Sequence, residues 1–151
     1  MNDSRRRSGF TLIEVLIVVV IMAVLAATII PQFSSSTEDA KASTLKFNLH
    51  TMRSQIELYK LQHNGLLPQI TSNSLPQLTS NTKVDGTVGT GASFPLGPYV
   101  QGELPANPFD GKKTVTAATF PFDATEAAAG GWIYDASTGK IAAGHATYYV
   151  E

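Results

Sequence analysis

The sequence predicts an α+β protein in which one long N-terminal helix, half transmembrane and half amphipathic, packs on a small antiparallel β-sheet. Residues 10–33 are almost entirely apolar, residues 34–65 carry apolar side chains at helical spacing, and strand-like segments lie near the C-terminus. Helix followed by strands is the pattern of an α+β fold. In 151 residues there is room for one modest domain beyond the helix, residues 66–151.

The apolar run is long enough to cross a membrane. Between Phe10 and Ile30 the polar side chains are Thr11, Glu14 and Thr28. A helix of this length spans roughly 30 Å, which is the thickness of the hydrocarbon core of a bilayer. The basic residues Arg5, Arg6 and Arg7 precede the run and nothing equally basic follows directly, so the positive-inside rule places the N-terminus in the cytoplasm.

Glu14 is the anomalous residue of this segment. A carboxylate inside an apolar helix costs about 2 to 3 kcal/mol on insertion scales unless it finds a cation or water. Glu14 therefore either lies near the membrane edge, where headgroups and water relieve its charge, or has a cationic partner.

Pro31 divides the predicted helix into two halves. Proline removes one backbone hydrogen bond, so either the helix bends near residues 27–31 or it stops there. The amphipathic pattern beyond it favours a bend, because one apolar stripe follows at spacings of four and three: Leu45, Leu49, Met52, Ile56 and Tyr59. The helix should end near Asn64 and Gly65, with Gly65 as its C-terminal cap and Pro68 beyond.

The segment from 66 to 113 predicts loops around short elements. Residues 75–78 fit a brief helical turn. The glycine-rich segment 82–93 lacks the strand, helix and lysine of a phosphate-binding loop, and predicts a flexible loop.

The strand signals lie near the C-terminus. Residues 131–134 and 140–143 flank a five-residue hairpin loop, 135–139, and residues 114–119 and 148–150 could add strands. The apolar face of this sheet would cover the apolar stripe of the helix.

Composition argues against several classes of function. The net charge of −1 does not predict a nucleic-acid surface, and the absence of cysteine excludes disulfides and thiolate metal sites. The three histidines, His50, His63 and His145, are isolated in sequence, and no serine lies in a nucleophile-elbow pattern. We expect no enzyme activity and no cofactor.

The N-terminal motif resembles a known signal. A basic leader, Gly9, then Phe10-Thr-Leu-Ile-Glu14, an apolar run and Pro31 resemble the prepilin-type class III signal of the type IV filament superfamily, which includes type IV pilins and the pseudopilins of type II secretion. The resemblance covers residues 5–33. It implies a pilin-like fold and a leader, residues 1–9, that a prepilin peptidase removes by cutting between Gly9 and Phe10.

The resemblance also implies roles for two residues of the mature chain. The freed amine of Phe10 would be methylated. Glu14 would meet the Phe10 amine of a neighbouring subunit and set the register of a helical filament, since the pair offsets both desolvation costs.

Within this superfamily the chain looks most like the major pseudopilin of a type II secretion system. The absence of cysteine favours a pseudopilin, because many pilins close their C-terminal region with a disulfide. The implied partners are other copies of the chain, minor pseudopilins, an inner-membrane assembly platform and membrane lipid. The chain would cross the inner membrane once, with its C-terminal domain in the periplasm.

One property of the family is not carried over. Major pseudopilins hold calcium in an acidic loop near the C-terminus. The acids of this chain are scattered there among alanine, glycine and threonine: Asp110, Asp123, Glu126 and Asp135.

Three alternatives remain open. The chain could be a type IV pilin of a surface fibre for adhesion, motility or DNA uptake, or a membrane-anchored periplasmic binding module. It could also carry an ordinary secretory signal peptide cleaved at the small residues Ala23, Ala26 and Ala27, although the apolar run continues beyond them.

Overall fold

The computed structural model describes residues 10–148, and of residues 30–35 it describes the backbone alone. The predicted leader, residues 1–9, and residues 149–151 lie outside the described residues, so Gly9 and most of the strand predicted at 148–150 do too. The chain divides into two compact units at Ala40 and Lys41, and each is described by itself.

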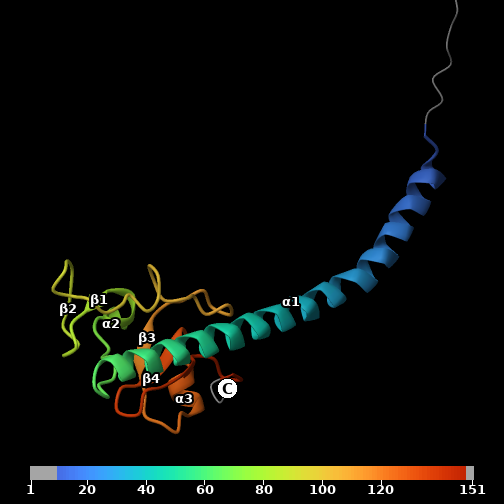
Figure 1. Cartoon of the computed structure of the whole chain (residues 1–151). Coiled ribbons are helices and arrows are strands. Elements are labelled where there is room, and N and C mark those ends of the chain that lie inside the picture. The colour runs from blue at the N-terminus through green and yellow to red at the C-terminus, as the bar shows by residue number, and fades with distance from the viewer. Residues whose placement is uncertain (1–9, 149–151) are drawn as a thin grey trace, which may run out of the picture. The chain divides into compact units, whose positions relative to one another are not determined.

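One helix, α1 (Leu12–Gln62), passes through Pro31, so the alternative in which the helix stops at the proline is wrong (Figure 1). The bend near Pro31 stays a prediction. The C-terminal end of α1 has the predicted cap. Asn64 and Gly65 have φ angles of 55° and 88°, and the Gly65 amide donates a hydrogen bond to the Lys60 carbonyl at 2.8 Å. Glycine adopts this left-handed conformation without strain, which is why it ends helices.

In the first unit, the stretch Leu12–Ile29 of α1 is long and apolar enough to cross a membrane. The side chains of this stretch are exposed within the subunit. Among the described residues of its own unit, this half of the helix therefore has no apolar partner.

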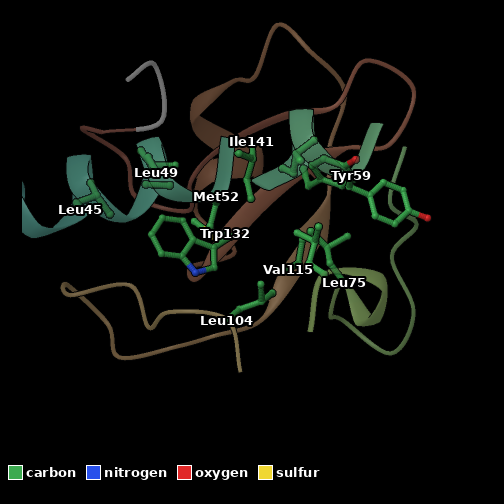
Figure 2. Close-up of a cluster of buried hydrophobic side chains, with 13 residues drawn as sticks. Leu45, Leu49, Met52, Tyr59, Leu75, Leu104, Val115, Trp132 and Ile141 are labelled. Carbon is green, nitrogen blue, oxygen red and sulfur yellow. The ribbon is translucent and has the colours of Figure 1, made fainter. Parts of the chain in front are cut away.

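In the second unit, α1 packs its apolar stripe into the core. All five predicted stripe residues are at most 1% exposed: Leu45, Leu49, Met52, Ile56 and Tyr59. Figure 2 shows Leu49 and Met52 beside Trp132, the largest buried side chain of the core. The stripe covers a sheet of β3 (Val115–Ala117), β4 (Trp132–Asp135) and β5 (Lys140–Ala143), in the order β3-β4-β5. The predicted α+β class is confirmed.

The sheet differs from the prediction in detail. β4 and β5 form the predicted antiparallel hairpin, but Asp135 pairs with Lys140, so the loop is 136–139 rather than 135–139. β3 pairs with β4 in parallel, so the sheet is mixed and not wholly antiparallel. The reason is that the chain between them forms a crossover containing the short helix α3 (Ala124–Ala127), and a crossover returns the chain in the same direction. Tyr148 lies in a turn and not in a strand.

The connecting segment contains more regular structure than predicted. The helical turn expected near residues 75–78 is α2 (Pro76–Thr79). The glycine-rich segment 82–93 was predicted to be a flexible loop, and this is wrong in part, because β1 (Asn81–Thr82) and β2 (Val88–Gly89) pair antiparallel there. Thr82 is buried and exchanges backbone hydrogen bonds with Leu96 at 2.8 and 3.2 Å, which ties the segment to the domain.

Candidate assembly site at the helix N-terminus

The N-terminus of α1 is organised by Thr11 and Glu14. Thr11 precedes the first helical residue, and its backbone N–H and its hydroxyl both donate to the Glu14 carboxylate oxygen Oε2 at 2.7 Å. In return, the Glu14 amide donates to the Thr11 hydroxyl oxygen at 3.3 Å. These reciprocal bonds form a capping box, which satisfies amide groups that the first turn of a helix leaves without partners. The sequence signal of a capping box, Thr-x-x-Glu, is present at residues 11–14 and would have predicted these bonds.

The capping box occupies one oxygen of the Glu14 carboxylate. Within residues 10–148, the hydrogen bonds to the Glu14 carboxylate come from Thr11 and reach Oε2, and no ion pair involves Glu14. Phe10 lies directly before Thr11 and its side chain is 89% exposed. Because Gly9 precedes Phe10 in this chain, the Phe10 nitrogen is an amide here and not a free amine. The pairing of Glu14 with a neighbouring Phe10 amine stays a prediction.

The side chains around Glu14 are apolar, and among the described residues of the unit no other segment covers them. The neighbouring side chains Leu12 and Ile17 are 83% and 51% exposed. The other polar side chain whose bond is described in this stretch, Thr28, donates to the Leu25 carbonyl at 2.9 Å and so is satisfied by its own helix. The carboxylate of Glu14 is thus a charge on an apolar surface that has to be covered by lipid or by protein.

The other site residues predicted from the sequence are not brought into this cluster. Gly9 lies outside the described residues. Pro31 has a helical backbone within α1 and lies several turns away from Glu14 along that helix. The structure therefore brings together Phe10, Thr11 and Glu14.

The histidines of the globular unit do not form a site. His63 is fully buried, stacks on Tyr59 with ring centroids 3.7 Å apart, and bonds the Tyr59 carbonyl at 2.8 Å. Its other ring nitrogen is 2.9 Å from the Thr82 hydroxyl, so His63 joins the end of α1 to β1. Within residues 10–148, no three histidine or acidic side chains are grouped as metal ligands.

Comparisons with known proteins identify the same N-terminal segment. Residues 4–30 match the prokaryotic N-terminal methylation motif, which confirms the prepilin-type signal predicted at residues 5–33. The chain is similar to the type II secretion system core protein G of Pseudomonas aeruginosa, with 41% identity over 59 residues that cover 39% of this chain and 42% of that protein. It is also similar to core protein G of Aeromonas hydrophila, with 35% identity over 62 residues, 41% of this chain and 43% of that protein.

A longer match is found to core protein G of Klebsiella michiganensis, with 30% identity over 93 residues, 56% of this chain and 66% of that protein. The chain thus spans roughly two fifths of the length of the first two relatives, 42% and 43%. No solved structure matches the chain.

Proposed function

We propose that this chain, which carries the prokaryotic N-terminal methylation motif, is a structural subunit of a helical filament and acts as the major pseudopilin of a type II protein secretion system. One observation carries the proposal: Glu14, whose carboxylate accepts the hydrogen bonds of a capping box, lies on an exposed apolar helix within the methylation motif of residues 4–30. Such a surface suits a protein that is stored in lipid and then packed against copies of itself.

Processing creates the cation that Glu14 needs. A prepilin peptidase cuts between Gly9 and Phe10, so the Phe10 nitrogen becomes an amine, which is then methylated and stays positively charged. In the filament this amine meets Glu14 of a neighbouring subunit. The ion pair offsets the cost of burying either charge alone and fixes the axial position of each added subunit.

The capping box prepares the carboxylate for this contact. Thr11 holds Oε2, so an ammonium group can approach Oε1 without breaking either bond. The Thr11 amide is not consumed by the cut, because the bond that breaks lies on the other side of Phe10. The box therefore survives processing.

The globular unit leaves a second uncharged face on α1. Phe47, Leu58 and Leu61 are 71%, 41% and 78% exposed and lie on one side of the helix, opposite the buried stripe. In a filament of identical subunits this face continues the helix-to-helix packing beyond the membrane segment, with another copy of the chain as its partner. Phe47→Ser should lower fibre yield without changing the melting temperature of the subunit.

The proposed location and partners follow from the same segment. The leader stays in the cytoplasm, the apolar half of α1 lies in the inner membrane, and the globular unit lies in the periplasm. The partners are inner-membrane lipid, the prepilin peptidase, minor pseudopilins and the assembly platform. The role is structural and not catalytic, in keeping with the buried polar side chains of the globular unit, which are held in the fold: His63, Thr82, Asn107 and Asp135.

Mass spectrometry of the N-terminus, together with electron microscopy of the purified fraction, tests the proposal. We expect a chain that begins at methylated Phe10 and assembles into fibres ending in the periplasm. An intact Met1 would instead support a membrane-anchored binding module, and a cut after Ala26 a secreted protein. Long surface fibres at normal expression would support a type IV pilin.

A further inference from the structure

The resemblance to major pseudopilins implies a calcium ion held near the C-terminus. A calcium ion takes six to eight oxygen ligands, usually including several carboxylate oxygens with free lone pairs. Between residues 104 and 148, the carboxylates of this region are those of Asp110, Asp123, Glu126 and Asp135. Whether this chain can hold the ion depends on how each carboxylate is already used.

Asp135, at the end of β4, is fully engaged. Its Oδ1 accepts hydrogen bonds from the amide and hydroxyl of Ser137, at 2.8 and 2.6 Å. Its Oδ2 accepts from the Phe120 amide at 3.1 Å and from the Thr138 hydroxyl at 2.9 Å. An ionised carboxylate offers about four acceptor positions. The four donors fill them and leave no lone pair for a metal.

Asp110 accepts two backbone amides, one at each carboxylate oxygen. Its Oδ1 accepts from the Lys112 amide at 2.9 Å, and its Oδ2 accepts from the Gly131 amide at 2.7 Å. The Lys112 ammonium group donates to the Ala129 carbonyl at 3.2 Å, next to the glycine pair 130–131. The positive charge beside this carbonyl is thus supplied by a lysine of the chain itself.

Asp123 and Glu126 are used at the start of α3. Asp123 accepts from the amides of Thr125 and Glu126, both at 2.8 Å. Glu126 accepts from the Asp123 amide at 3.3 Å and from the Thr119 amide at 2.9 Å. These are the bonds of a capping box with one additional link back toward β3.

From this pattern we infer that the C-terminal region of this chain folds without calcium, because hydrogen-bonded carboxylates hold together the segments that a cation would otherwise join. Asp135 ties the segment after β3, at Phe120, to the turn after β4, at Ser137 and Thr138. Asp110 ties the loop 107–112 to Gly131, just before β4. At Asp135 a calcium ion could enter only by displacing amide and hydroxyl donors, and Asp110, Asp123 and Glu126 each already accept two backbone amides, which cannot serve as calcium ligands.

Thermal unfolding of the full-length chain in detergent micelles tests this inference. Trp132 is the single tryptophan and is buried, so its fluorescence reports the globular unit. We expect melting temperatures in excess EGTA and in excess CaCl2 to agree within about 2 °C, whereas a site filled at a hundred times its dissociation constant would raise the melting temperature by roughly 10 °C or more. A rise of that size with CaCl2 would overturn the inference.

Variants distinguish stabilisation by the hydrogen bonds of Asp135 from stabilisation by a metal ion bound to Asp135. Asp135→Asn should lower the melting temperature by about 4 °C or more, and equally in EGTA and in CaCl2. Asp85→Asn is the matched control, because Asp85 is exposed and is bonded by Thr87 within its own turn, with the Thr87 amide donating at 2.9 Å. If Asp135→Asn does not fold, Ser137→Ala removes a single donor and should give a smaller decrease. A decrease seen in CaCl2 and absent in EGTA would overturn the inference, since it would show that Asp135 acts through the ion.

Discussion

The two halves of α1 have the same secondary structure but opposite surroundings. In the stretch Leu12–Ile29 the side chains other than Glu14 and Thr28 are apolar around the whole circumference, and the stretch is exposed within the subunit. In the half from Leu45 to Tyr59 the apolar residues form a single stripe, and this stripe is buried against the sheet. An amphipathic half needs one partner surface, which its own chain supplies, whereas an apolar circumference needs lipid or several neighbouring helices.

Charged side chains follow the same division. In the second half, Arg53 donates to the Ile141 carbonyl of β5 at 3.0 and 3.3 Å, so a charge near the core is satisfied inside the subunit. In the first half, Glu14 is bonded only by Thr11 among residues 10–148, and no cation within that range forms an ion pair with it. The comparison indicates that the second half stabilises the subunit, whereas the proposed function assigns the first half to contacts with lipid and with other copies of the chain.

The largest expected effect comes from the same substitution made in each half. Leu49→Ala removes a side chain that is 1% exposed and should lower the free energy of unfolding of the globular unit by about 2 to 5 kcal/mol, because it leaves a cavity. Leu16→Ala, at a side chain that is 57% exposed, should change it by less than about 0.5 kcal/mol. Urea unfolding followed by Trp132 fluorescence measures both. Equal effects would remove the distinction between the halves.

A second experiment measures assembly, for which a substitution in the first half of α1 should have the larger effect. Glu14→Ala should leave membrane insertion and the unfolding of the globular unit unchanged, yet reduce fibre yield by roughly tenfold or more, since about 2 kcal/mol of pairing energy is lost. Glu14→Gln is the control for shape, because it keeps the acceptor oxygen for Thr11 but not the charge. Normal fibre yield from Glu14→Ala would contradict the proposed pairing.

The pH dependence of stability should reside in the second unit. Hydrogen bonds from the Ser137 side chain and from the Phe120 and Ser137 amides hold the pKa of Asp135 well below its usual value of about 3.9. Because the folded-state pKa is the lower one, this contribution to stability is complete above the unfolded-state pKa and is lost as pH falls towards the folded-state pKa. Urea unfolding of wild type at pH 7 and near pH 3 should show the loss, and Asp135→Asn should show a smaller one. An equal acid response in the variant would assign the effect to other groups.

The features that could be predicted from the sequence are local ones. The spacing of the apolar stripe predicted all five residues of α1 that are buried among its described side chains, and the strand-like segments 131–134 and 140–143 on either side of a hairpin loop predicted β4 and β5. The parallel pairing of β3 with β4 could not be predicted, because it depends on a crossover whose direction no local pattern specifies. The two-residue strands β1 and β2 are too short to show a period of two. At the candidate site, the processing motif was predicted, but the partner of Glu14 inside the subunit was not.

Thr11, the partner of Glu14, could be predicted from the Thr-x-x-Glu signal, and its substitution has the smallest expected effect. Thr11→Val keeps the size of the side chain but removes the hydroxyl that bonds the Glu14 carboxylate and amide, so the first turn of α1 should lose about 0.5 to 2 kcal/mol. Amide hydrogen exchange of the chain in micelles should become faster at residues 12–14 and stay unchanged from Leu45 to Tyr59. Thr11→Ser keeps the hydroxyl and should restore protection. Because the capping box forms within one subunit, faster amide exchange of Thr11→Val in dispersed material would show that Thr11 acts without assembly. Unchanged exchange would show that Thr11 does not hold Glu14 before Glu14 meets a neighbouring subunit.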